Sequence, residues 1–370
     1  MFSQGTRSVI ITGAGHYIPE VVKRNEDFGE NTFFNTKGEP YDTGDCISSI
    51  KRVSGIEERR YISEGQTLSN IASLAAQNLF DTNPVIKESL DLLVVAHNSG
   101  NVNSKSLQPS AIPNIGALVK QELGIGRSEM LTYDLIAGCP GFLILLSSVY
   151  DRIISGRADK AGVIGAEAIS PLLDEHNRDS MLFGDGAGMV SLEGVMTRNK
   201  VGILSIQERS DSLKYAGIIT TGKSMNPAQR EHIHPIIEGS KVSKYALGHV
   251  PQVIKASIEK AGLGIKDIDL LLIHQANLGL NYGIGKRLFE LYEMKIDEPD
   301  LIKSMPMTIQ KLGNTSVASI PTLISLIMKG ELEGYEIKPG SNMVMASVGA
   351  GMHISSIVYR VPKAQDFITY

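Results

Sequence analysis

The sequence predicts an α/β protein in which two similar halves each contain a mixed, mostly parallel β-sheet. Short apolar runs of strand length alternate with longer runs of helical periodicity, as is typical of this fold class. The run 91–96 (Asp-Leu-Leu-Val-Val-Ala) returns as 269–274 (Asp-Leu-Leu-Leu-Ile-His), and an apolar helix follows each copy after a similar interval. We therefore divide the chain into an N-terminal half, 1–197, and a C-terminal half, 198–370.

The composition is that of a globular enzyme rather than a nucleic-acid or membrane protein. The chain has 370 residues, 42% of them hydrophobic and 21% charged, and a net charge of -4. It has no long basic block, no signal-peptide layout at its start and no apolar run long enough to cross a bilayer. Two cysteines, Cys46 and Cys139, are too few for a disulfide framework or a cysteine metal site. We expect a cytoplasmic protein with no metal and with no nucleic-acid or membrane partner.

In the N-terminal half, residues 8–12 form a β-rich run that ends in Gly-Ala-Gly. A dinucleotide site is not expected there, because the third glycine is missing and Pro19 interrupts the segment where the phosphate-binding helix would begin. Residues 67–80 have helical spacing with a Thr or Ser cap, and 161–165 indicate a buried strand. The segment 51–60 is rich in charge, and we expect most of it to be a solvated turn.

Cys139 lies where a short apolar approach meets a long apolar helix. Gly138 and Gly141 permit a tight bend, Pro140 suits the first helical position, and the helix is predicted to run to Ile154. A cysteine at a helix N-terminus is expected to favour the thiolate form, and hence to act as a nucleophile. The alternative is that Cys139 is an inert, buried small side chain.

The repeat in the C-terminal half supplies two partners for Cys139. Residues 313–316 open the apolar helix of the second copy, so Asn314 should face Cys139 across the pseudo-symmetry axis. His274 ends a buried strand, which is where parallel sheets usually carry their functional groups. Taken alone, His274 could be a structural histidine. Because the repeat delivers all three side chains to one centre, we favour the functional interpretation.

These residues fit acyl-transfer chemistry. A cysteine beside an imidazole can attack a thioester carbonyl and form an acyl-enzyme. Backbone N–H groups of Cys139 and of the turn 349–351 would hold the oxyanion. His274 and Asn314 could then stabilise the enolate that a carbon–carbon bond-forming Claisen condensation requires.

The motifs that carry these residues resemble those of the β-ketoacyl-acyl-carrier-protein synthase III family. They are Ala-Gly-Cys-Pro-Gly-Phe around Cys139, Ile-His-Gln-Ala-Asn from Ile273 and Gly-Asn-Thr-Ser-Val-Ala-Ser-Ile-Pro around Asn314, together with Phe-Gly-Asp-Gly-Ala at 183–187 and Ser-Gly-Ile-Glu-Glu-Arg at 54–59. The resemblance spans nearly the whole chain. It implies the thiolase fold, a five-layered αβαβα arrangement that works as a homodimer with an acyl carrier protein.

The resemblance also implies the reaction and its site. An acyl group passes from a thioester to Cys139 and is then condensed with an extender on a carrier protein, such as a malonyl or β-ketoacyl thioester. His274 and Asn314 activate the extender, and the oxyanion hole consists of the Cys139 N–H and a backbone N–H near Ala350. The substrates are thioesters of coenzyme A or phosphopantetheine, and no cofactor is expected.

Departures from the family pattern bear on the substrate. The tryptophan and arginine that grip coenzyme A in housekeeping members are absent here, with Ser49 and Val53 near those places, and a further arginine is replaced by Gly279. This favours delivery by a carrier protein and a role in a specialised pathway. The predicted substrate or carrier contacts are Arg178, Asn277, Lys286 and Arg287. For Lys286 and Arg287, an ordinary solvated helix face is the competing interpretation.

Three other functions stay open at this stage. The first is a ketosynthase that joins two acyl thioesters into a dialkylresorcinol or cyclohexanedione. The second is an acyltransferase that passes the acyl group to oxygen or nitrogen without forming a carbon–carbon bond. The third, a non-catalytic partner in a heterodimer, is disfavoured because all three positions of the triad are filled.

Overall fold

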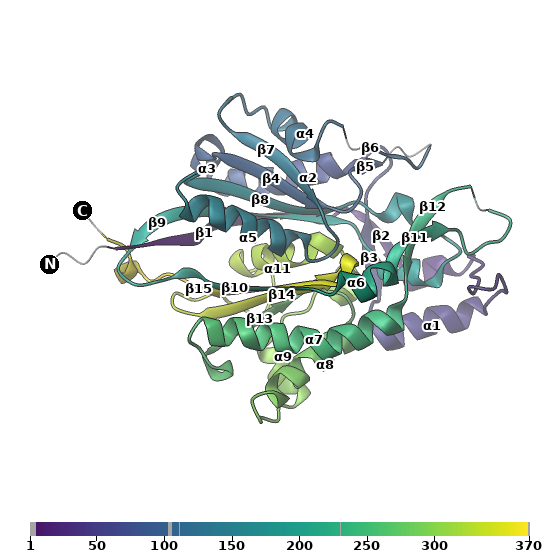
Figure 1. Ribbon diagram of the computed structural model, residues 1–370. Helices are drawn as coiled ribbons and strands as arrows, with labels where there is room; N and C mark the ends of the chain where they lie inside the picture. The colour runs from purple at the N-terminus through teal and green to yellow at the C-terminus, as the bar shows by residue number, and fades with distance from the viewer. Residues whose placement is uncertain (1–4, 103–105, 111, 230, 369–370) are drawn as a thin grey trace.

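The computed structural model describes residues 5–102, 106–110, 112–229 and 231–368, which are arranged around two β-sheets (Figure 1). The first sheet has the order β1-β9-β8-β4-β7, with bounds Thr6–Tyr17, Gly186–Thr197, Lys160–Glu167, Leu92–His97 and Leu131–Ile136. The second has the order β10-β15-β14-β13, with bounds Gly202–Ser210, His353–Arg360, Asn342–Gly349 and Leu270–Ile273. The predicted division between residues 197 and 198 falls between β9 and β10.

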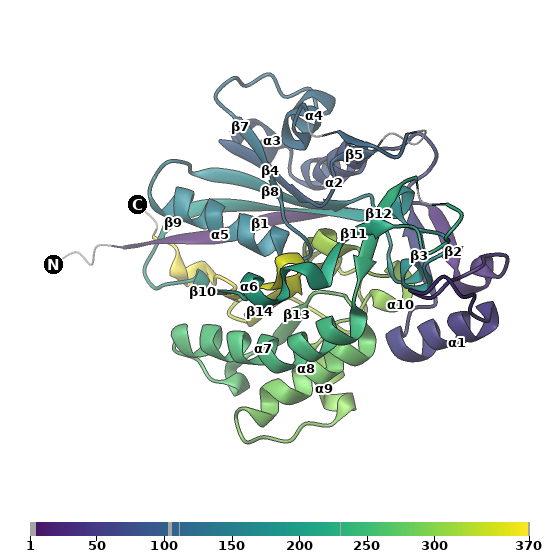
Figure 2. The same ribbon diagram turned by 45° about the vertical axis from the view of Figure 1, so that its right-hand side comes forward.

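Helices cover both sheets and fill the space between them, so the molecule has the expected five layers αβαβα. One outer layer contains α2 (Leu68–Thr82), α3 (Pro84–Ser89) and α4 (Ile115–Glu122). The central layer contains α5 (Gly141–Ile154) and α11 (Ser319–Met328), and the other outer layer contains α7 (Gly239–Lys260), α8 (Leu278–Glu290) and α9 (Glu298–Ser304). Figure 2 shows the same layers after rotation by 45°.

The sheets are mixed, as predicted, but the expectation that they are mostly parallel was wrong. Only the pairs β4–β7, β4–β8 and β13–β14 are parallel, and the other four pairs in the two large sheets are antiparallel. The connections explain this difference. A parallel pair needs a long crossover, whereas β14 and β15 are joined only by the 3-10 turn η7 (Ala350–Met352).

The two central helices explain why their sequences are apolar around most of the circumference. Each is packed between the sheets, and their side chains share one hydrophobic core that includes Leu143, Leu146, Val149, Ile320, Leu323 and Ile324. The α5 helix ends at Ile154 as predicted, and Gly156 has a φ of 74°, the left-handed conformation that suits a helix terminus. The start of α5 is thereby fixed between the two halves.

A hairpin, the helix α1 and several short elements complete the structure. A two-stranded hairpin, β11 (Ile219–Lys223) and β12 (Ile233–Ile237), lies on the same side of the molecule as α1 (Thr43–Ser54) in Figure 2. The other short elements are β2 (Val21–Arg24), η1 (Asn25–Phe28), β3 (Glu58–Tyr61), β5 (Asn101–Val102), β6 (Pro109–Ser110), η2 (Ser170–Leu172), η3 (Arg178–Leu182), α6 (Ser212–Tyr215), η4 (Ala216–Ile218), η5 (Ile265–Asp267), α10 (Ile309–Leu312), η6 (Ser316–Ala318) and η8 (Ala364–Asp366). None of the helices described is both long and apolar enough to cross a membrane.

Candidate active site

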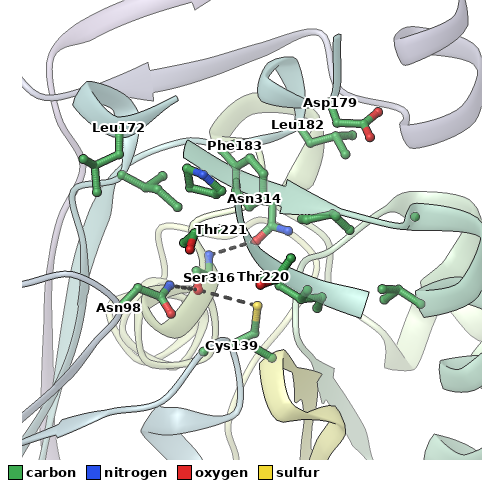
Figure 3. Close-up of a pocket in the computed structure, with 18 of the residues that line it drawn as sticks. Asn98, Cys139, Leu172, Asp179, Leu182, Phe183, Thr220, Thr221, Asn314 and Ser316 are labelled. Carbon is green, nitrogen blue, oxygen red and sulfur yellow. Dashed lines mark hydrogen bonds between the residues drawn. The ribbon is translucent and has the colours of Figure 1, made fainter. Parts of the chain in front are cut away.

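A cavity of about 1370 Å³ lies where the two halves meet, and Cys139, His274 and Asn314 all line it. The hairpin β11–β12 contributes Thr220 and Thr221 to its wall, and η3 and the residue after it contribute Leu182 and Phe183 (Figure 3). The three residues that the repeat predicted to meet are therefore brought to one space. Most of the other side chains around them are apolar.

Cys139 lies in the turn between β7 and α5. Its Sγ accepts a hydrogen bond from the Ser316 hydroxyl at 3.5 Å (Figure 3). The pKa of the Cys139 thiol is raised to about 11, mainly by burial; the Ser316 hydrogen bond lowers it and the charge of the nearby Glu167 raises it. The helix N-terminus was expected to favour the thiolate of Cys139, and burial acts in the opposite direction.

His274 follows directly after β13, and its backbone N–H donates to Ala346 at 2.8 Å. Its Nδ1 is hydrogen-bonded to the Ser319 hydroxyl at 2.8 Å, and its carbonyl accepts from the side chain of Asn281 at 3.0 Å. Burial lowers the pKa of His274 to about 3, so the imidazole is neutral at physiological pH. Among the residues described, no group is hydrogen-bonded to Nε2, which is available to a ligand.

Asn314 is held by strand-like pairing rather than by a helix. Its backbone N–H donates to Leu182 at 2.8 Å and its carbonyl accepts from Gly184 at 3.0 Å, forming a parallel bridge with Phe183. Residues 313–316 lead into the second central helix as predicted, with η6 beginning at Ser316 and α11 at Ser319, and the pairing with Phe183 positions Asn314 just before it. The Phe-Gly-Asp-Gly motif thus serves to position Asn314.

The backbone around Ala350 approaches Cys139 closely. A Cβ added at Gly349 would lie 2.8 Å from the Cys139 backbone nitrogen, and one added at Gly138 would lie 3.0 Å from the Ala350 nitrogen. Both positions need glycine for this reason. The approach brings the backbones of the two predicted oxyanion-hole residues, Cys139 and Ala350, together from opposite halves of the molecule.

Three further residues of the site were not predicted from the sequence. Asn98 follows β4, Glu167 is the last residue of β8, and Ser316 lies two residues after Asn314. For Asn98 and Glu167 the available signal was a polar residue at the carboxyl end of a buried strand, the same signal that identified His274. This signal was missed because the predicted strands 91–96 and 161–165 stop before Asn98 and Glu167.

The predicted substrate contacts are divided between the cavity and the surface. Arg178 and Asn277 line the cavity, as do Ser49 and Val53. The Arg178 guanidinium lies over the Tyr41 ring at 4.8 Å, and the Asn277 side chain caps α8 by accepting from Leu280 at 3.0 Å.

Lys286 and Arg287 lie farther along α8 and are not among the residues that line the cavity. The Lys286 ammonium pairs with Glu298 at 3.8 Å, and the Arg287 guanidinium donates to the Leu247 carbonyl at 3.1 Å. Their contact with a carrier protein stays a prediction, and it would take place on the outer surface rather than in the cavity.

Comparison with known proteins identifies the family. Residues 133–212 match the model for 3-oxoacyl-[acyl-carrier-protein] synthase III, and residues 258–361 match the model for its C-terminal part. The beta-ketoacyl-[acyl-carrier-protein] synthase III of Ruegeria pomeroyi is 31% identical over 95% of this chain and 98% of that protein. This chain belongs to the β-ketoacyl-[acyl-carrier-protein] synthase III family.

Solved structures agree with membership of the synthase III family. The synthase III of Thermus thermophilus is 28% identical, with a TM-score of 0.77 over 95% of this chain and 98% of that one. The priming β-ketosynthase from the R1128 polyketide pathway, 22% identical with a TM-score of 0.78 over 98% of this chain and 99% of that one, shares the fold. The chain is thus an acyltransferase-type condensing enzyme with the thiolase fold. The comparisons favour this over the other functions left open by the sequence.

Proposed function

We propose that this synthase takes an acyl group from a thioester onto Cys139 and condenses it with a malonyl or β-ketoacyl thioester on an acyl carrier protein. The observation that carries this proposal is the single cavity in which Cys139, His274 and Asn314 meet, with the backbone of Ala350 against the nucleophile. No cofactor is required, because the thioester itself activates the acyl group.

The hydrogen bonds in the cavity support distinct roles for the triad. The Cys139 sulfur attacks the donor carbonyl, and the N–H groups of Cys139 and Ala350 receive the oxyanion. The Asn314 Oδ1 accepts from the Ser316 backbone N–H at 2.9 Å, which leaves its NH₂ group as a donor. In the second step this NH₂ and a neutral His274 donate to the extender's thioester oxygen and stabilise the enolate.

The size of the cavity supports a donor with an extended acyl chain. Its volume of about 1370 Å³ is larger than the roughly 300–1,000 Å³ of a pocket for a drug-sized ligand. It can hold a phosphopantetheine arm and an acyl chain at once. Ser49 and Val53 in its wall offer no large or charged side chain to a coenzyme A nucleotide. We therefore favour an acyl carrier protein as donor.

We further propose that the enzyme is a homodimer formed along β7. Among the residues described, β7 pairs with β4 alone, so its other edge is open. Leu131 and Ile136 on this strand are 50% and 65% exposed, which is costly for an isolated edge strand. We place the dimer in the cytoplasm, where reducing conditions keep the Cys139 thiol free.

Mass spectrometry after incubation with octanoyl-pantetheine tests the acyl transfer. The wild-type protein should gain one octanoyl group, and Cys139→Ala should gain none. Asn314→Ala should still be acylated but should form no condensation product with a malonyl carrier protein. Absence of acylation in the wild type, an adduct that survives Cys139→Ala, or normal product formation by Asn314→Ala would each contradict the proposal.

Light scattering tests the dimer. Leu131→Arg on β7 should shift the mass from dimer to monomer, whereas Leu213→Arg on α6, at a fully exposed position, should leave it unchanged. A monomeric wild type, or a dimer that persists in Leu131→Arg, would contradict β7 as the interface.

A further inference from the structure

A buried carboxylate lies beside the proposed nucleophile without a role in the steps above. Glu167 ends β8 and its side chain is fully buried, with 0% of the residue exposed. Its Oε2 accepts a hydrogen bond from the Asn98 side chain, while its Oε1 has no partner among the residues described. A buried carboxylate with one unpaired oxygen is costly for stability, so it calls for a functional explanation.

Ser316 connects this carboxylate to Cys139. The Asn98 NH₂ group donates to the Ser316 Oγ at 2.9 Å, and the Ser316 hydroxyl donates to the Cys139 Sγ at 3.5 Å (Figure 3). The same Asn98 nitrogen donates to Glu167 and to Ser316, so the two side chains are neighbours, and Ser316 lowers the pKa of Glu167. The one hydroxyl proton of Ser316 can point to either group. Asn98 acts as the donor to both Glu167 and Ser316, so it fixes their positions.

We propose that Glu167, acting through Ser316, receives the thiol proton of Cys139 when the acyl-enzyme forms. The thiol proton passes to the Ser316 Oγ as the Ser316 hydroxyl proton passes to the Glu167 carboxylate. The sulfur then forms a bond to the acyl carbon, and the bond from that carbon to the donor sulfur breaks. The departing pantetheine thiolate takes the proton back from Glu167 through Ser316. This inference rests on the proposed acyl transfer to Cys139.

The pKa values of the buried groups favour Glu167 over His274 as the proton acceptor. Burial raises the pKa of Glu167 to about 8, with a contribution from the charge of Asp185, and burial lowers the pKa of His274 to about 3. Since the pKa of Cys139 is about 11, transfer of the proton to Glu167 is much less unfavourable. Among the residues described, the charge of Asp185 raises the pKa of Glu167, and the charge of Glu167 raises the pKa of Cys139. His274 keeps its role as a neutral hydrogen-bond donor.

The test uses two variants, Glu167→Gln and Ser316→Ala. The matched control is Glu193→Gln on β9, where the carboxylate pairs with the Lys160 ammonium at 3.1 Å. The rate of acylation by octanoyl-pantetheine is measured between pH 6 and 10. In the wild type and the control it should rise to a plateau near pH 8. In Glu167→Gln and Ser316→Ala it should fall about 100-fold at pH 8, the lower range of general-base effects, and keep rising to pH 10.

Alkylation of Cys139 by iodoacetamide separates this mechanism from a purely electrostatic effect. If Glu167 only repels the thiolate, Glu167→Gln lowers the pKa of Cys139 and accelerates both alkylation and acylation at pH 8, which would overturn the proposal. An unchanged pH profile in either variant would also overturn it. Thermal denaturation verifies that the variants are folded. If Glu167→Gln is not folded, the pH profile of acylation in Ser316→Ala tests the proposal. No acylation of the wild type would instead refute the proposed function itself.

Discussion

Gly349→Ala tests the close approach between the two halves at the nucleophile. The φ of Gly349 is -173°, an extended conformation that alanine adopts without strain, so the added methyl group acts only through its contacts. It would lie 2.7 Å from the Pro140 Cδ and 2.8 Å from the Cys139 nitrogen, whereas ordinary contacts begin at 3.4 Å. The backbone must therefore separate by about 0.6 Å, more than the ~0.5 Å within which a catalytic constellation must be held.

We expect this separation to remove the Ala350 N–H from the oxyanion hole. Loss of one such donor costs about 100- to 1,000-fold in rate, or roughly 2.7–4 kcal/mol. Overpacking should also lower the free energy of unfolding by about 1–3 kcal/mol. The assay is the single-turnover rate of Cys139 acylation by octanoyl-pantetheine, with the melting temperature measured in parallel.

The matched control is Gly248→Ala in α7, where an added Cβ would have no neighbour within 4 Å. It should leave acylation unchanged and stabilise the helix by about 0.5–1 kcal/mol. If Gly349→Ala is folded and acylates Cys139 within about threefold of the wild-type rate, the Ala350 N–H is not part of the oxyanion hole.

Three further predictions concern stability. Arg59→Met should lower the free energy of unfolding, measured by urea denaturation, by about 3–5 kcal/mol. The reason is that the fully buried guanidinium donates to Asn25 and to two backbone carbonyls. A loss below about 1 kcal/mol would contradict this. Since the pKa of Glu167 rises from 4.5 to about 8 on folding, the native state binds the extra proton and stability falls as pH rises through this window. Glu167→Gln should therefore stabilise the protein at pH 8.5 but not at pH 4, and an equal effect at both values would refute it. Asp174→Asn should speed amide hydrogen exchange in β11 and β12. The Asp174 carboxylate accepts from the Ser224 hydroxyl at 2.9 Å and from the Met225 backbone N–H at 2.6 Å, just after β11. Unchanged exchange would show that these contacts do not hold the hairpin.

The repeated halves could be predicted because burial on both faces leaves a direct trace in the sequence. Strands β4 and β13 correspond to the two matching apolar runs, and α5 and α11 are apolar around most of their circumference because each is packed between two sheets. The strands whose partners run antiparallel were harder to assign. Strand direction depends on how the chain returns between elements, and β8 is followed by irregular turns rather than by a crossover helix.

The charge states of the site could not be predicted from the sequence. Helix position alone suggested an ionised Cys139, but the pKa of a buried group depends on how completely the surrounding layers exclude water. Burial also separates prediction from structure at Arg59. This residue was expected in a solvated turn, but it is fully buried and packs against Gly184 and Gly313. Distant segments create both environments, so local sequence patterns give no signal for them.

The contact between Gly349 and Cys139 gives the duplicated architecture a functional consequence. Each half contributes what the other lacks: the N-terminal half has the thiol and the Glu167 carboxylate, and the C-terminal half has Ser316, His274, Asn314 and the Ala350 N–H. In the proposed mechanism, a fragment that contains either half alone lacks part of the proton path and part of the oxyanion hole. The proposed mechanism therefore requires that the two sheets be docked across α5 and α11, and it predicts that the rate of acylation depends on that docking.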